Sequence, residues 1–248
     1  MKLSSVINYP LSLLGLKPGK KKAALQASLP RDIAADKAFV DIYERIHPYT
    51  LVEPERCYAL YKAVEYVIRK DIPGDLAECG VWKGGSCMLM ALTLLRLGVS
   101  DRKLWLYDTF TGMTKPGVQD GAAEKTEWEE KSTGSDESSW CLASLEEVKA
   151  NMRSTGYPPE QMMFIKGKVE ETIPGTIPAS LSLLRLDTDW YASTRHELVH
   201  LFPLLAPGGV LLIDDYGAWQ GAQKATDEYF GDKVLLHRID WTGRLLIK

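Results

Sequence analysis

Four acidic residues follow two apolar segments of this chain, at the point where each segment would end as a strand. Asp187 and Asp189 come directly after one segment, and Asp214 and Asp215 come directly after the other. Asp187 and Asp214 are 27 residues apart, which is about the length of one strand–helix–strand crossover. We therefore expect the two segment ends to lie side by side, with three or four carboxylates on one rim.

Carboxylates held this close together repel one another unless protons or a cation neutralise them. A site with only oxygen ligands favours a hard cation such as Mg²⁺, which keeps open positions for a substrate. A single aspartate at a strand end is more simply a helix cap that faces water. The four together favour a Mg²⁺ site over that interpretation.

A glycine-rich turn supplies a second set of chemically informative residues. The run from Glu78 to Ser86 reads ECGVWKGGS, and it lacks the G-x-G-x-x-G spacing of a dinucleotide-binding turn. An acid before the first glycine would repel a pyrophosphate but attract a cationic ligand. Asp108, thirty residues after Glu78, ends the next predicted strand, where a carboxylate can accept ribose hydroxyls. Each feature alone also fits a tight turn or a capping Asp, but together they suit S-adenosylmethionine.

A competing motif, H-E-x-x-H, spans His196 to His200. On a helix this pattern can bind zinc and supply a general base for peptide hydrolysis. Here the apolar side of the predicted helix should pack on the sheet, which would turn both histidines toward solvent or a subunit neighbour. The acids Asp227 and Glu228 are the nearest beyond the aspartate pair, so a zinc peptidase stays an alternative that the context disfavours.

The elements that must position these residues alternate along the chain. Apolar residues recur at three and four positions in the helical segments, and short apolar runs end at turn residues in the strands. This alternation predicts an α/β fold with a doubly wound, mostly parallel, seven-stranded, Rossmann-like sheet and N-terminal helices. Strands are expected at residues 76–80, 103–107, 163–166, 181–186, 210–213, 234–237 and 245–248, and helices at 34–70 (broken at 47–48), 86–97, 191–205 and 220–230.

Two segments fall outside this alternation. Residues 1–33 include five lysines and no acid before Pro30, and we interpret them as a flexible arm or an oligomer contact preceding a domain at 34–248. Residues 114–139 are polar and aperiodic, with seven acids and three lysines. Trp128 and Trp140 lie in or next to this second segment, so we predict a lid loop over a substrate.

Composition excludes several classes of protein. The 248 residues carry a formal net charge of −3, which gives no sign of a nucleic-acid-binding surface. No apolar run approaches the roughly 20 residues that a transmembrane helix needs, and the lysines after the first apolar stretch are in the wrong order for a secretory signal. The four cysteines match no zinc pattern and are expected to be reduced, which favours the cytoplasm.

Five blocks of this sequence carry a family resemblance. They are DLAECGVWKGGS (75–86), YDTFTGM (107–113), GKVEETIP (167–174), LDTDWY (186–191) and PGGVLLIDDYG (207–217). In this order they resemble the macrocin O-methyltransferase family, whose members methylate sugar hydroxyls of natural products. The resemblance covers about residues 49–230 and implies a class I methyltransferase fold, S-adenosylmethionine and Mg²⁺. It also implies a glycosylated small-molecule acceptor and a homodimer or larger assembly, and we expect the methylated hydroxyl to belong to a vicinal diol.

Carried onto this sequence, the resemblance assigns a role to each site residue. Asp187, Asp214 and Asp215 would hold the metal, and Asp189 would be the catalytic base. A protein that binds a nucleoside without catalysis is the remaining alternative, although binding adenosine requires none of these acids. The residues expected to bind the cofactor are Tyr49, Thr50, Glu78, Gly80, Ser86, Asp108, Gly112, Gly167 and Val169.

Overall fold

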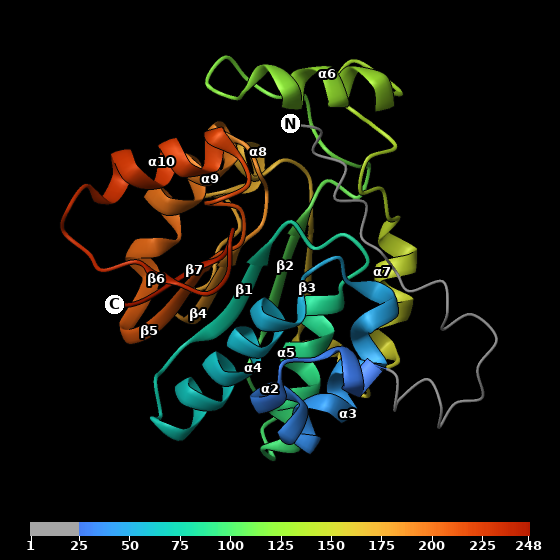
Figure 1. Ribbon diagram of the computed structural model, residues 1–248, viewed down its shortest axis with the longest axis vertical. Coiled ribbons are helices and arrows are strands. Elements are labelled where there is room, and N and C mark those ends of the chain that lie inside the picture. Colours follow the sequence, from blue (N-terminus) through green and yellow to red (C-terminus); the bar gives the residue numbers. More distant parts are fainter. Residues whose placement is uncertain (1–24) are drawn as a thin grey trace.

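Seven strands form one sheet in the computed structural model, which describes residues 25–248 (Figure 1). The strand order is β3-β2-β1-β4-β5-β7-β6; β1 to β5 are parallel, and β7 is antiparallel to both β5 and β6. The predicted doubly wound α/β fold is therefore confirmed. The strands are β1 (Asp75–Cys79), β2 (Leu104–Asp108), β3 (Met162–Lys166), β4 (Leu181–Leu186), β5 (Leu205–Ile213), β6 (His237–Arg238) and β7 (Arg244–Ile247).

Helices cover both faces of this sheet. One face carries α3, α4, α5 and α7, and the other carries α8, α9 and α10, as Figure 1 shows. The predicted break at residues 47–48 is confirmed as a short 3-10 turn, η2, between α3 and α4. The helices are α2 (Arg31–Ala35), α3 (Lys37–Ile46), η2 (His47–Tyr49), α4 (Pro54–Arg69), α5 (Gly85–Arg96), α6 (Ala122–Lys131), α7 (Leu145–Arg153), η3 (Pro159–Gln161), α8 (Val169–Thr172), α9 (Tyr191–His200), η4 (Phe202–Leu204) and α10 (Gln220–Phe230).

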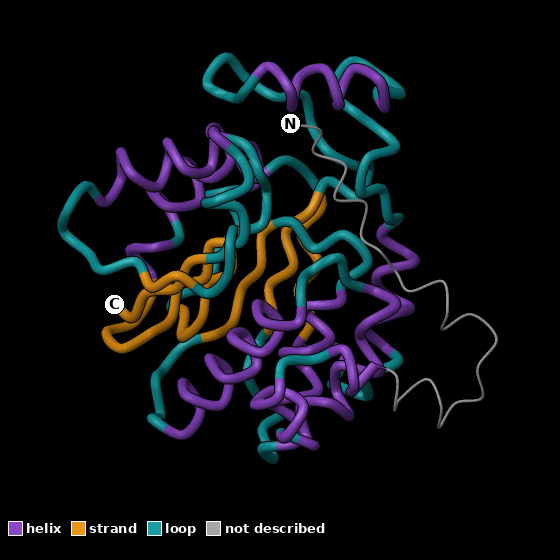
Figure 2. The backbone as a smooth tube through the Cα atoms, in the orientation of Figure 1, coloured by secondary structure: helices purple, strands orange, loops and turns teal. Residues whose placement is uncertain are grey.

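Alternation within the strands divides the core into two layers. In β2, Leu104 and Leu106 pack against the α3–α5 side, whereas Trp105 and Tyr107 pack against the other side. Successive side chains of a strand point to opposite faces, so a strand covered on both faces is apolar throughout. This arrangement leaves the carboxyl ends of the parallel strands as one edge of the sheet, and Figure 2 shows loops gathered there.

Three predicted elements in the C-terminal half have wrong boundaries. The helix expected at 191–205 ends at His200, and strand β5 begins at Leu205, five residues before the predicted start. Pro203 has no backbone N–H, so the α-helical hydrogen bonds cannot continue through it, and the chain passes into the short 3-10 turn η4 instead. The strand expected at 234–237 shares only His237 with β6, which is His237–Arg238 and pairs with β7 at these two positions.

Residues 114–139 are not a structureless loop, because they contain the ten-residue helix α6. Its sequence, AAEKTEWEEK, consists largely of strong helix formers. It buries little of its surface, with Trp128 as its one buried aromatic residue, so no apolar period marks it. Figure 1 shows α6 beyond the carboxyl ends of the strands, apart from the helices that cover the sheet.

The described part of the predicted N-terminal arm packs on the core. Leu25, Leu29 and Ile33 are buried against the α3–α5 layer, so the packed part of the chain begins before the boundary expected at residue 34. The lysines of the arm lie outside the described residues, and the prediction for residues 1–24 stays a prediction. Among the helices of residues 25–248, none has the length and apolar character that crossing a membrane requires.

Candidate active site

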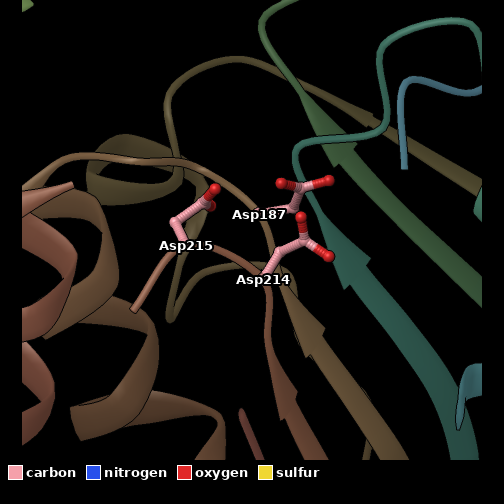
Figure 3. Close-up of side chains that lie close together, drawn as sticks. All are labelled: Asp187, Asp214 and Asp215. Atoms are coloured by element: carbon pink, nitrogen blue, oxygen red, sulfur yellow. The ribbon is translucent and has the colours of Figure 1, made fainter. Parts of the chain in front are cut away.

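The acids at the ends of β4 and β5 converge. These strands are parallel neighbours, and the backbone N–H of Asp214 donates to the carbonyl of Leu186 at 2.9 Å. Asp187, Asp214 and Asp215 each offer one carboxylate oxygen within 4.8 Å of the others. Figure 3 shows the three side chains gathered beyond the strand ends. The sequence prediction that these acids share one rim is therefore correct in its geometry.

Arg185 lies beneath this rim, as the last residue but one of the buried strand β4. Its side chain is only 2% exposed, and its guanidinium donates to Glu78, to Asp214 and, at 2.6 Å, to Oδ2 of Asp187. A buried cation is stable only when paired and hydrogen-bonded, and here three carboxylates pair with it. Arg185 thus connects the acid of the glycine-rich turn with the acids at the ends of β4 and β5.

A second arginine reaches the same acids from outside the sheet. Arg56, on α4, donates from Nη1 to Asp214 and from Nε to Oδ2 of Asp240 at 2.9 Å. The hydroxyl of Thr242 donates to the backbone carbonyl of Asp214 at 2.8 Å. The loop between β6 and β7 is therefore fastened to the end of β5, and Asp214 is held by two guanidinium groups.

The remaining acids, Asp189 and Asp215, share a hydrogen bond. Burial raises the pKa of Asp189 to about 8 and raises that of Asp215 well above its usual range, and the other acids of the cluster raise both further. Asp189 has a left-handed backbone with φ +67°, which is unusual for a residue other than glycine.

This cluster fits a divalent cation. The two arginines pair with Asp187 and Asp214, whereas Asp189 and Asp215 have no cationic partner among the described residues. Only carboxylate oxygens are offered, which is the donor set that Mg²⁺ prefers. Asp187, Asp214 and Asp215 could hold such an ion, leaving Asp189 beside it.

The glycine-rich turn after β1 lies against this cluster. A Cβ on Gly80 would come within 1.9 Å of the carbonyl oxygen of Asp187, and Gly80 has a φ of +81°. Only glycine permits this approach at this backbone angle. The turn therefore brings the end of β1 into contact with the loop that carries Asp187 and Asp189.

Both acids of the predicted cofactor site make contacts within the protein. Asp108 accepts backbone N–H groups of Val81 and Trp82 through Oδ2, at 2.8 and 3.1 Å, and thereby braces the turn. Glu78 is buried, and its two oxygens accept from Arg185 and, at 2.6 Å, from the thiol of Cys87. Burial raises the pKa of Glu78 to about 7.

A cavity of about 560 Å³ joins the turn and the acid cluster. Its size suits a small-molecule ligand. All thirteen residues that the sequence predicted for the cofactor, the metal and the base line it, and their individual roles remain predictions. They are Tyr49, Thr50, Glu78, Gly80, Ser86, Asp108, Gly112, Gly167, Val169, Asp187, Asp189, Asp214 and Asp215.

Aromatic residues cover one side of the cavity. Trp140, Trp190 and Trp219 pack edge to face, with ring centroids 5.8 to 5.9 Å apart, and Trp140 and Trp219 line the cavity. These three residues come from three different loops. The cluster therefore ties the end of the 114–139 segment to the loops that follow β4 and β5.

The predicted lid segment also has its own contacts with the site. Ala123 and Glu127 of α6 line the cavity. The carboxylate of Asp120 accepts the backbone N–H of Tyr191, at the start of α9, at 2.8 Å. The indole of Trp128 donates to the carbonyl of Met113 at 2.9 Å. The segment is thus ordered against the site, in agreement with a lid, whose movement remains a prediction.

The H-E-x-x-H motif does not form a metal site with other described residues. Glu197 is fully buried, so it does not face outward with the histidines. Both rings are half-buried, with centroids 4.4 Å apart, and Nε2 of His196 lies 2.8 Å from the carbonyl of Ile173. Between residues 25 and 248, the one group of His, Cys, Asp or Glu that could hold a metal is the aspartate cluster.

Sequence reasoning missed the two arginines and the tryptophans that directly precede α9 and α10. Arg185 did carry a signal, because a charge within the buried strand 181–186 requires a partner. Arg56 carried none, since it occupies an ordinary position on an amphipathic helix. Trp190 and Trp219 follow the acids closely in sequence, at the strand ends where ligands collect.

Comparison with known proteins identifies the family. The profile of the macrocin O-methyltransferase family (TylF) matches residues 22–247. The chain is 35% identical, over 79% of its length and 74% of the relative's, to 8-demethyl-8-(2,3-dimethoxy-alpha-L-rhamnosyl)-tetracenomycin-C 4'-O-methyltransferase of Streptomyces olivaceus. It is 36% identical to demethyldecarbamoylnovobiocin O-methyltransferase of Streptomyces niveus, over 73% of this chain and 67% of that one.

Solved structures agree with this result. The O-methyltransferase NovP superimposes with a TM-score of 0.72 at 33% identity, covering 81% of this chain and 82% of that one. The calicheamicin methyltransferase CalS11 matches with a TM-score of 0.58 at 17% identity, covering 94% and 93%. The second match shows the fold alone.

Proposed function

This chain belongs to the macrocin O-methyltransferase family, and we propose that it methylates a sugar hydroxyl of a small-molecule acceptor, using S-adenosylmethionine and a Mg²⁺ ion held by Asp187, Asp214 and Asp215. The observation that supports this most is the convergence of three carboxylates, within 4.8 Å, on the cavity beside the glycine-rich turn. The relative from Streptomyces olivaceus is named for methylation of a rhamnosyl derivative, which supports a sugar as the acceptor.

The methyl donor would bind beside the carboxyl end of β1. S-adenosylmethionine supplies an electrophilic methyl group on a sulfonium. Gly80 would let the backbone approach the donor closely, and Asp108 would accept its ribose hydroxyls, since this carboxylate lines the cavity at the end of β2. Glu78 would act through charge, because it is almost fully buried and pairs with Arg185.

The acceptor would bind beside the carboxyl ends of β4 and β5. Asp187, Asp214 and Asp215 would hold a cation, which would supply the Lewis acidity that lowers the proton affinity of an acceptor hydroxyl, for example one of a vicinal diol. Asp189, which lines the same cavity, would remove the proton of the hydroxyl that becomes methylated. The chain would gain rate largely by aligning the acceptor oxygen with the donor methyl.

Two alternatives from the sequence are set aside. Family membership makes the chain an O-methyltransferase, which disfavours a non-catalytic nucleoside-binding protein. The buried position of Glu197 disfavours a zinc peptidase, because the base of such an enzyme must reach a metal-bound water.

The test is methyl transfer from labelled S-adenosylmethionine to a panel of rhamnosylated and other glycosylated small molecules. Activity should disappear in excess EDTA and return when Mg²⁺ is added beyond the chelator. Full activity in the presence of the chelator would contradict the metal part of the proposal.

A further inference from the structure

Glu197, the central acid of the H-E-x-x-H motif, is fully buried although it has no place in the proposed chemistry. Its Oε1 accepts a hydrogen bond from the hydroxyl of Thr188 at 2.9 Å. Its Oε2 is buried and has no hydrogen-bond partner among the described residues. Burying a carboxyl group that has an unpaired oxygen costs free energy. We therefore expect a structural role for its hydrogen bond to Thr188.

Thr188 is the middle residue of the turn that carries two of the site's acids. Its carbonyl accepts from the backbone N–H of Trp190 at 2.7 Å and from the hydroxyl of Ser193 at 3.3 Å. The bond from its own hydroxyl to Glu197 is a further attachment. On either side of Thr188 lie Asp187, in the metal cluster, and Asp189, whose backbone is left-handed.

A left-handed backbone at a residue other than glycine persists only where its surroundings hold it. The attachments of Thr188 fix the turn to α9, the helix that follows it. Glu197 is on the buried side of that helix, nine residues after Thr188, so its carboxyl group reaches back beneath the turn. The carboxyl group therefore links the packed helix to the conformation of the catalytic loop.

We propose that Glu197 is a positioning residue, which through its hydrogen bond to Thr188 holds the 187–189 turn so that Asp187 and Asp189 face the cavity. This inference rests on the proposed metal site. Burial raises the pKa of Glu197 well above its usual range, which agrees with a neutral carboxyl group that acts through hydrogen bonding and not through charge. The glutamate of the H-E-x-x-H motif would thus have a structural role next to the methyltransferase site.

The experiment measures Mn²⁺ affinity of the full chain, saturated with S-adenosylhomocysteine, by electron paramagnetic resonance. Thr188→Val removes the donor and Glu197→Met removes the acceptor, while both keep a similar side-chain shape. Each should weaken Mn²⁺ binding about tenfold, the lower end of the range for residues that orient metal ligands. Glu197→Gln keeps an acceptor and should stay within about twofold of the wild type.

Thr93→Val is the matched control. It also removes a buried threonine hydroxyl, one that donates to Leu89 within α5 at 2.7 Å, and it should leave Mn²⁺ affinity unchanged. The double variant Thr188→Val/Glu197→Met should bind Mn²⁺ as each single variant does, because both changes break the same bond. Affinity for S-adenosylhomocysteine, measured by calorimetry, should be unchanged in every variant.

Each other outcome would overturn the inference. Wild-type Mn²⁺ affinity in Thr188→Val or Glu197→Met would show that the bond does not position the turn. Equal losses in Glu197→Gln and Glu197→Met, additive losses in the double variant, or loss of S-adenosylhomocysteine binding would show a different role for these residues. Failure of the wild-type protein itself to bind Mn²⁺ would instead reject the metal site of the proposed function, and this inference with it.

Discussion

The guanidinium of Arg185 donates to the carboxylate of Asp214 on the neighbouring strand, and this ion pair is almost completely buried. Through its other nitrogen the same side chain contacts Glu78 below the glycine-rich turn and Asp187 beside the metal cluster. One cation therefore joins the two halves of the site. Neither half would keep its arrangement if that cation were removed.

Arg185→Met should lower the free energy of unfolding by about 3–5 kcal/mol, because it leaves buried carboxylates without their partner. Urea unfolding at neutral pH measures this. The control is Arg69→Met, which removes an exposed arginine from the buried Glu65 but leaves Glu65 paired with Lys62 and Arg96. It should cost less than about 1 kcal/mol. Equal effects of the two substitutions would contradict a central role for Arg185 in stability.

Asp189→Asn should lower kcat for methyl transfer by about 10²- to 10⁴-fold, the usual contribution of a general base. The substitution keeps the size of the side chain, so the affinity for S-adenosylhomocysteine should not change. Steady-state kinetics and calorimetry measure the two quantities separately. Turnover near that of the wild type would remove Asp189 from the role of base.

Gly80→Ala should disrupt both the fold and the site, because its Cβ would overlap the carbonyl of Asp187. Gly98→Ala is a control for backbone angle alone, since Gly98 has a φ of +75° and nothing within 4 Å of its Cβ position. We expect a cost of about 1–2 kcal/mol for Gly98→Ala and a larger loss for Gly80→Ala. Similar unfolding free energies for both variants would contradict the tight contact with the Asp187 loop.

Glu197 should make the protein less stable as the pH rises. Burial raises its pKa, so the folded protein holds this proton more tightly than the unfolded chain, where the pKa is near 4.5. Its stabilising contribution is therefore complete below that pH and is lost as the pH rises toward the pKa of the folded state. Glu197→Gln removes this titration.

Urea unfolding of both proteins between about pH 5 and pH 8 tests this prediction. The stability of Glu197→Gln relative to the wild type should increase with pH, by at most about 1.4 kcal/mol per pH unit, the value for one proton. A constant difference across the range would mean that Glu197 titrates normally in the folded protein.

Much of this fold could be predicted from the sequence, because the signals for its strands, helices and turns lie in short stretches of the chain. The apolar run before Asp187 and the turn around Gly80 mark a strand end and a close backbone approach, and both occur where expected. Helix α6 was not predicted, because its sequence has helix propensity but no periodic pattern of apolar residues. A periodic pattern of apolar residues arises where one face of a helix packs against the core, and α6 packs mainly through Trp128.

The contacts that organise the site are not local. Arg56 and Asp214 are 158 residues apart, and only the fold brings them together. Glu197 appeared in the sequence as part of a zinc motif, since spacing alone does not tell which way a side chain on a helix faces. Its burial and its bond to Thr188 required the packed structure.

The most direct test of the account is a crystal structure of the protein with S-adenosylhomocysteine and Mn²⁺, in which anomalous scattering locates the metal. We predict one strong peak bonded to carboxylate oxygens of Asp187, Asp214 and Asp215, beside the sulfur of the bound product. A structure with the product in its cavity, but with Mn²⁺ absent from these aspartates or bound elsewhere, would contradict the central claim.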